Sequence, residues 1–292
     1  MKSPDFLCIG AQKSGTTWLH KNLLEHPNIS FPHLKELHYY DEIEAGICTN
    51  LYCRIFNKHW KNEWWRHTLK YSMYEALKSK NVKKFIWLLN YFFSPRGKYW
   101  YMSLFPNDSN TISGELTPEY AALSPKLIKR IHNHFPEVKI ILLLRNPIER
   151  EWSGIKMWHK RVRNVKSMDE VESEFLIAQA KQRNDLSEYC TTIENWTATF
   201  PRQQILIRFF DEIVDNPRDL LQDVYSFLGI EGNFQTGVEE VAANKGLSGK
   251  IPSEIKSILW SKYKQELLKL EPFFEDAPIN YVRKWLDEEE SI

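Results

Sequence analysis

The first 24 residues of the chain form a pattern that strongly limits what it can fold into. An apolar run at residues 6–9 ends at Gly10, and a short polar loop follows as far as Gly15. Beyond the loop, apolar residues recur at the spacing of one helix face: Trp18, Leu19, Leu23 and Leu24. The pattern predicts a strand, a loop and a helix. A glycine turn at a helix N-terminus presents unpaired N–H groups, which can hold an anion such as a phosphate.

The loop differs from a nucleoside-triphosphate loop in one respect. Gly10 and Gly15 fit the frame G-x-x-x-x-G, after which such a loop requires Lys followed by Ser or Thr. Here Thr16 and Thr17 follow the second glycine, and the lysine lies inside the loop as Lys13. We therefore expect a phosphate-binding loop for another kind of nucleotide. A glycine turn with only a structural role is the alternative.

A second anion site is predicted near the middle of the chain. Residues 138–144 form the strongest strand signal, an apolar run typical of a central parallel strand buried on both faces. Arg145 follows directly, and Ser153 lies on the predicted next helix. Because ligands bind beyond the carboxyl ends of such strands, Arg145 is placed to bind a second phosphate with its fork of donors. An arginine on a solvated loop is the alternative.

Charged and aromatic residues crowd together at residues 35–41, soon after the first loop. Glu36 and His38 are candidates for general-base work beside an anion site. A solvated turn with a buried tyrosine is the alternative. Further along, Asn244, Lys245 and Gly246 begin a small basic loop that either closes over a nucleotide or is a plain surface loop.

Residues from about 45 to 110 differ in composition from the rest of the chain. Five tryptophans and many tyrosines and phenylalanines alternate with lysines there. Such rings can stack on sugar or lipid faces, or they can build the core of a helical subdomain. We expect an aromatic-rich, mostly helical insertion that shapes the acceptor side of a cleft.

Composition limits the remaining possibilities. With 292 residues, 42% of them apolar, the chain can form one large α/β domain, and we assign residues 1–292 to it. The 39 basic and 38 acidic residues give a net charge of +1, so no global field favours a nucleic-acid partner or a strongly anionic membrane, and any attraction for an anion must be local. No apolar run approaches the roughly 20 residues of a membrane span. The four cysteines lack metal-ligand spacing, so we expect reduced thiols and a cytoplasmic protein without a leader. A Cys48–Cys53 disulfide in an oxidising compartment is the alternative.

Together these motifs resemble the sulfotransferases that use 3′-phosphoadenosine 5′-phosphosulfate (PAPS), in particular the branch that includes the heparan-sulfate sulfotransferases. Residues 10–17 are similar to the family's 5′-phosphosulfate loop, and the Arg-Asn-Pro turn at 145–147 is similar to its 3′-phosphate motif. The resemblance implies an α/β fold of P-loop type, with a central parallel sheet between two helical layers. It also implies a set of donor-binding residues: Lys13, Ser14, Gly15, Thr16, Thr17, Trp18, Arg145, Ser153, Asn244, Lys245 and Gly246.

The resemblance further implies an enzyme. Glu36 corresponds to the catalytic base of the branch, assisted by Lys13 and His38. The implied reaction moves a sulfuryl group from PAPS to a hydroxyl or amine, on a saccharide or glycolipid, and releases 3′,5′-bisphosphate (PAP) without a metal ion. Members acting on heparan sulfate often have a lysine where this chain has Leu116, so the resemblance does not imply that heparan sulfate is the acceptor. A P-loop kinase and a nucleotide-binding interaction protein without chemistry are the alternatives, and the oligomeric state stays open.

Overall fold

A computed structural model of the chain describes residues 1–182, 185–231, 247 and 249–290. Its centre is a sheet of five parallel strands in the order β2-β3-β1-β4-β5. The strand bounds are β1 Phe6–Gly10, β2 Ile29–Ser30, β3 Ile112–Leu116, β4 Lys139–Leu144 and β5 Ile205–Phe209. The predicted central strand is β4, which lies between β1 and β5.

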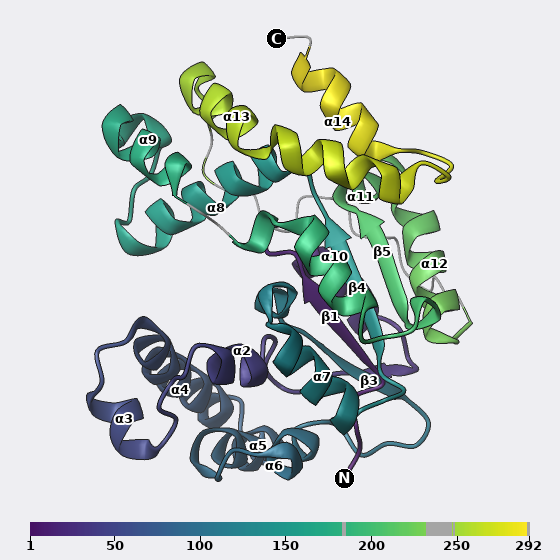
Figure 1. The fold of residues 1–292 in the computed structure, drawn as a ribbon. Coiled ribbons are helices and arrows are strands. Elements are labelled where there is room, and N and C mark those ends of the chain that lie inside the picture. Colours follow the sequence, from purple (N-terminus) through teal and green to yellow (C-terminus); the bar gives the residue numbers. More distant parts are fainter. Residues whose placement is uncertain (183–184, 232–246, 248, 291–292) are drawn as a thin grey trace.

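Helices cover both faces of this sheet (Figure 1). The helices before β3 are α1 Thr16–Leu24, α2 Tyr39–Glu44, α3 Leu51–Phe56, α4 Trp60–Lys78, α5 Val82–Phe93 and α6 Lys98–Ser103. Those between β3 and β5 are α7 Pro125–His134, α8 Pro147–Val162, α9 Ser173–Lys181 and α10 Tyr189–Thr197. After β5 come α11 Phe210–Asp215, α12 Pro217–Leu228, α13 Ser253–Leu270 and α14 Tyr281–Glu290.

Successive residues of the strands enter different hydrophobic cores. In β4, Ile140 and Leu142 join one core, whereas Ile141 and Leu143 join the core on the other face. Side chains alternate between the two faces of a strand, so a strand that is apolar throughout must be covered on both. The expected α/β architecture of three layers is therefore confirmed.

The stretch from about 45 to 110 is helical, as predicted. It contains α3, α4, α5 and α6, which lie together beside α2 at the lower left of Figure 1. Part of its aromatic content packs inward, including Trp65 and Trp100, which are almost fully buried in the core that also covers the sheet. Its role on the acceptor side, and the assignment of residues 1–292 to one domain, stay predictions.

The turn between β1 and α1 requires glycine at position 15. Gly15 has a φ of +91°, a conformation that L side chains rarely adopt. A β-carbon on this residue would lie 2.3 Å from Cδ1 of Ile213. The loop can therefore pass close to α11 only because this residue has no side chain.

The expectation of four reduced cysteines is wrong for one pair. Cys48 and Cys53 form a disulfide, with their α-carbons 5.8 Å apart, while Cys8 and Cys190 are free and buried. The fold brings the two sulfurs together because α3 begins at Leu51 and turns Cys53 back towards Cys48. Among the described residues, no helix is long and apolar enough to cross a membrane.

Candidate active site

The anion-binding loop predicted at the start of the chain lies beyond the carboxyl end of β1. The Ala11 N–H donates to the carbonyl of Leu143, 2.7 Å away, which ties the loop to β4. The Ser14 N–H donates back to Ala11 over 3.1 Å and closes the turn. Gly15 is the N-cap of α1 and offers no side-chain hydrogen bond to the helix. The first turn of α1 therefore presents its backbone donors and positive dipole end at the loop.

Arg145 lies against this loop, although 132 residues separate it from Lys13. Its guanidinium Nη1 donates to the backbone carbonyl of Lys13 over 3.1 Å. The guanidinium also lies 4.4 Å from the ring centroid of Phe210, and the Tyr189 hydroxyl donates to the Arg145 carbonyl over 2.8 Å. These contacts hold the second predicted anion motif next to the first.

The loop is the focus of a positive field. Burial lowers the pKa of Lys13, and so do the charges of four neighbouring cations: Arg145, Arg161, Lys156 and Lys35. Such mutual repulsion is relieved when an anion binds. Sequence reasoning missed Lys156 and Arg161. The sequence could have indicated Lys156, because this lysine follows Ser153 by three residues on α8 and so lies on the same face of the helix.

Lys35 joins the loop to the predicted base. Its ammonium donates to Oγ1 of Thr17 over 3.2 Å and to Oε1 of Glu36 over 2.7 Å. The Glu36 side chain is 33% exposed, so an acceptor can reach it. A single side chain, that of Lys35, therefore bridges Glu36 and the first turn of the helix that follows the anion loop.

His38 is held in its charged form beside Glu36. Burial opposes the charge, but the hydrogen bond and charge of Asp41, together with the charges of Glu119 and Glu36, raise the pKa of His38 to about 9. Its Nδ1 lies 2.9 Å from Oδ2 of Asp41, and its Nε2 lies 3.8 Å from Oε2 of Glu36. The Lys61 ammonium donates to the same Asp41 oxygen over 2.7 Å. The imidazolium therefore links two carboxylates.

Glu119 is a third carboxylate at this point. Residues 114–120 resemble the family's cleft-lining motif, but the sequence assigned no role to Glu119 itself. Its Oε1 accepts from Nε2 of Gln12, a residue of the anion loop, over 3.1 Å. Burial raises the pKa of Glu119, and the nearby charge of His38 acts in the opposite direction. Glu36, His38 and Glu119 offer ligand atoms within 4.8 Å of one another, a spacing that a divalent cation could use. A charged imidazole has no free lone pair, so proton binding at His38 competes with such a cation.

Buried side chains clamp the backbone between Glu36 and Tyr39. The Leu37 N–H donates to Oε2 of Glu115 over 3.2 Å, and the Tyr91 hydroxyl donates to the Leu37 carbonyl over 3.2 Å. The Tyr39 N–H donates to the Tyr120 hydroxyl over 3.1 Å. The clamp explains how Glu36 and His38 are held with positive φ angles of 63° and 52°.

Trp18 and Ser153, also predicted at the donor, lie on the helices that follow β1 and β4. The Trp18 side chain is 3% exposed in the core that includes Leu19 and Leu116, and its backbone lies in the first turn of α1. Ser153 is half-buried on α8, in the helix that Arg145 precedes. Asn244, Lys245 and Gly246 lie outside the described residues.

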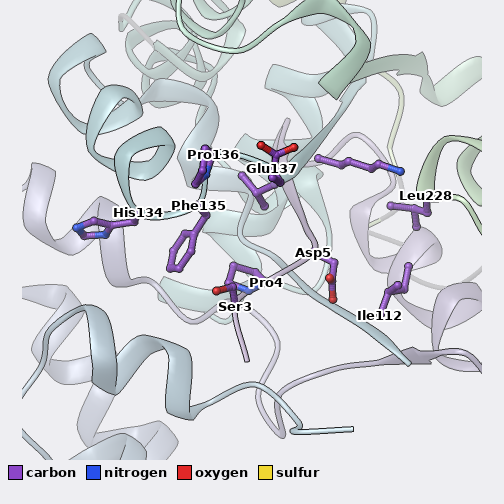
Figure 2. A pocket seen from close by; sticks show the side chains of 11 residues that line it. Ser3, Pro4, Asp5, Ile112, His134, Phe135, Pro136, Glu137 and Leu228 are labelled. Atoms are coloured by element: carbon purple, nitrogen blue, oxygen red, sulfur yellow. The ribbon is translucent and has the colours of Figure 1, made fainter. Parts of the chain in front are cut away.

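A separate cavity of about 340 Å³ lies at the other end of the sheet (Figure 2). Its lining includes Pro4 and Asp5, which precede β1, together with Phe135 and Glu137, which precede β4. The anion loop and Arg145 lie at the carboxyl ends of the same strands. This cavity is therefore distinct from the site described above.

Comparisons with known proteins identify the family of the chain. Residues 3–250 match the family model described as the sulfotransferase domain. The mouse bifunctional heparan sulfate N-deacetylase/N-sulfotransferase 4 is 26% identical over 246 residues, which cover 79% of this chain and 23% of that protein. The mouse heparan sulfate glucosamine 3-O-sulfotransferase 6 is 26% identical over 140 residues, covering 47% of this chain and 41% of the relative. The chain thus spans about a quarter to two fifths of the length of these relatives.

A solved structure extends the agreement to the fold. The sulfotransferase from Alicyclobacillus acidocaldarius superposes with a TM-score of 0.63 at 19% identity, covering 97% of this chain and all of that one. At this identity the likeness concerns the fold, and the family-model match over most of the chain carries the assignment. The chain belongs to the sulfotransferase family.

Proposed function

We propose that this protein transfers a sulfuryl group from PAPS to a hydroxyl or amine of a saccharide or glycolipid. The observation that carries the proposal is the position of Lys35, whose ammonium contacts both Thr17 of the anion loop and the carboxylate of Glu36. A base so close to an anion site suits a reaction in which an acceptor attacks an anionic donor. The names of the relatives, which include N- and O-sulfotransferases of heparan sulfate, support a saccharide acceptor.

The residues at the site fit a donor that carries phosphates at two positions. The Gly15 turn and the start of α1 suit the 5′-phosphosulfate, and Arg145 suits the 3′-phosphate. Burial and the crowding of cations around Lys13 together lower its pKa, and the crowding supports an anionic ligand there. Lys13 and Arg145 supply fixed positive charge, so the proposal needs no metal ion.

In the proposed reaction, the acceptor oxygen or nitrogen attacks the sulfur in line with the departing PAP. The bond from sulfur to the bridging oxygen breaks as the new bond to the acceptor forms. Glu36 takes the acceptor proton, and Lys13 stabilises the negative charge that develops on the bridging oxygen. His38, held by Asp41, orients the Glu36 carboxylate from 3.8 Å away. The products are PAP and the sulfated acceptor.

The acceptor side does not have the lysine that heparan-sulfate enzymes often carry: position 116 is a leucine in the core with 1% exposure. Glu36, Asp41 and Glu119 bring three carboxylates together around the charged His38. Lys35 pairs with Glu36 and Lys61 pairs with Asp41, so opposite charges are close to balance at the base. This balance gives a strongly anionic polymer no particular advantage and suits a neutral or amine-bearing saccharide. The predicted cytoplasmic location stays a prediction, and the Cys48–Cys53 disulfide argues for an oxidising compartment instead.

One experiment tests the function directly. The purified chain is incubated with PAPS and a panel of neutral glycans, amino sugars, glycolipids and heparan-type polymers, while PAP release and product mass are followed. We expect PAP release that depends on an acceptor and a product heavier by one sulfuryl group. Tight PAP binding without transfer to any acceptor would favour the interaction-protein alternative. Mg²⁺-dependent consumption of ATP would favour the kinase alternative.

A further inference from the structure

Helix α5 exposes an apolar stripe to water. Val82, Ile86, Leu89 and Phe93 are 67%, 61%, 39% and 50% exposed. Their spacing of four, three and four residues places them on one side of the helix. The side chains that α5 buries are different ones, Leu88, Tyr91 and Phe92. The helix is therefore apolar on a packed face and on an open face, which a water-exposed helix rarely is.

The preceding helix also exposes apolar side chains. Near the end of α4, Tyr74 and Leu77 are 60% and 64% exposed. Helix α4 packs against α5, and only residues 79–81 separate the two helices in sequence. We call the exposed apolar set the hairpin surface; it consists of Tyr74, Leu77, Val82, Ile86, Leu89 and Phe93.

Positive charge lies at the turn between the two helices of the hairpin surface. Residues 66–84 contain six lysines and arginines but a single acid, Glu75, in a chain whose net charge is only +1. Lys78, Lys80 and Lys83 are exposed and lie at or beside this turn. Within the described part of the chain, no carboxylate lies in ion-pairing distance of these three lysines. Exposed apolar and tyrosine side chains next to exposed lysines are the composition of helices that lie in a lipid interface.

We propose that the hairpin surface docks onto an anionic lipid membrane. The apolar stripe would enter the boundary between headgroups and acyl chains, and the lysines would contact the lipid phosphates and carboxylates. A second copy of the chain is a poorer fit, because a symmetric contact would bring two strongly positive hairpins together. The proposal goes beyond sulfuryl transfer and does not depend on it, since it concerns only this surface.

The test measures sedimentation of the full chain with lipid vesicles. Vesicles of phosphatidylcholine with phosphatidylserine are compared with vesicles of phosphatidylcholine alone, at low and at high salt. We expect binding to the anionic vesicles that weakens as salt rises. Ile86→Asp should lower this binding by about tenfold or more, since it places a charge in the stripe. Ile279→Asp is the matched control, because Ile279 is 51% exposed outside the hairpin, and this variant should bind like the wild type.

A second variant separates charge from apolar area. The double substitution Lys80→Glu and Lys83→Glu leaves the stripe intact and should also abolish binding to anionic vesicles. Circular dichroism checks that each variant is folded. The proposal is overturned by absence of binding to anionic vesicles, or by equal losses in Ile86→Asp and Ile279→Asp. A dimer of the wild type in sedimentation velocity, dissociated by Ile86→Asp, would also overturn the proposal if the wild type does not bind vesicles.

Discussion

The guanidinium of Arg145 donates a hydrogen bond to the backbone carbonyl of Lys13 over 3.1 Å. This contact joins the two predicted anion-binding motifs of the chain, one after β1 and one after β4. Adjacent parallel strands bring their carboxyl ends to one edge of the sheet, and β1 and β4 are neighbours. A single ligand with two phosphate groups can therefore contact both motifs, and four predictions follow from this site and its surroundings.

Arg145→Ala should weaken PAP binding by roughly 10- to 100-fold, because a charge-assisted hydrogen bond to phosphate is worth about 1.5–3 kcal/mol. Titration calorimetry with PAP measures the change. Arg218→Ala is the control, since Arg218 is an exposed arginine of α12, and its affinity should equal that of the wild type. Unchanged affinity in Arg145→Ala would remove the second phosphate site from the proposal.

Glu36→Gln should lower kcat by roughly 10²- to 10⁴-fold, the usual contribution of a general base, while PAP affinity stays the same. Steady-state PAP release and calorimetry provide the two readouts. Glu63→Gln, at an exposed position of α4, should match the wild type in both. Turnover that survives in Glu36→Gln would assign the base to another group, with Glu119 as the first candidate.

Gly15→Ala should destabilise the fold by about 1–3 kcal/mol, because the new β-carbon meets Ile213 and the residue has a positive φ. Gly154→Ala is the matched control, since it lies within α8 and an added methyl group there would have no neighbouring atom within 4 Å. Alanine is the better helix former by about 0.5–1 kcal/mol, so this variant should be as stable as the wild type or more so. Urea denaturation followed by circular dichroism measures both, and equal effects of the two substitutions would contradict the close packing at Gly15.

Stability should depend on pH through His38. Its pKa is about 9 in the folded protein against an ordinary value of 6.5. The stabilisation from charged His38 is therefore complete below about pH 6.5 and is lost as the pH rises through about 9. We expect it to reach at most about 3 kcal/mol. His38→Gln should remove this part of the slope in urea denaturation between about pH 6 and pH 10.

An exposed histidine provides the control for this pH dependence. His67 lies on α4 with an exposed side chain, so His67→Gln should keep the wild-type slope. If the wild type and His38→Gln lose stability in parallel over this range, the ion pairing of His38 with Asp41 and Glu36 does not act as described.

Much of the molecule followed from local sequence. The apolar run at residues 138–144, the glycine turn after residues 6–9 and the aromatic helices of residues 45–110 all formed the predicted elements. These predictions succeeded because strand burial, helix periodicity and glycine turns depend on residues that are neighbours in the sequence. The same local patterns placed Lys13 and Arg145 at the ends of strands, and the order of the strands then brought them together.

Tertiary structure alone decided which side chains meet. The contact of Lys35 with Thr17, the approach of Glu119 to His38 and the clamp on Leu37 by Glu115 join segments between 18 and 81 residues apart. The Trp18 side chain lies in the core because its face of α1 packs on the sheet, while its backbone stays in the first turn of α1 beside the loop. The sequence by itself determined the elements and the loops that carry the chemistry, through short-range periodicity and backbone freedom. Which charges share one site, and hence their pKa values, depended on long-range packing, because electrostatic coupling follows distance in space and not separation along the chain.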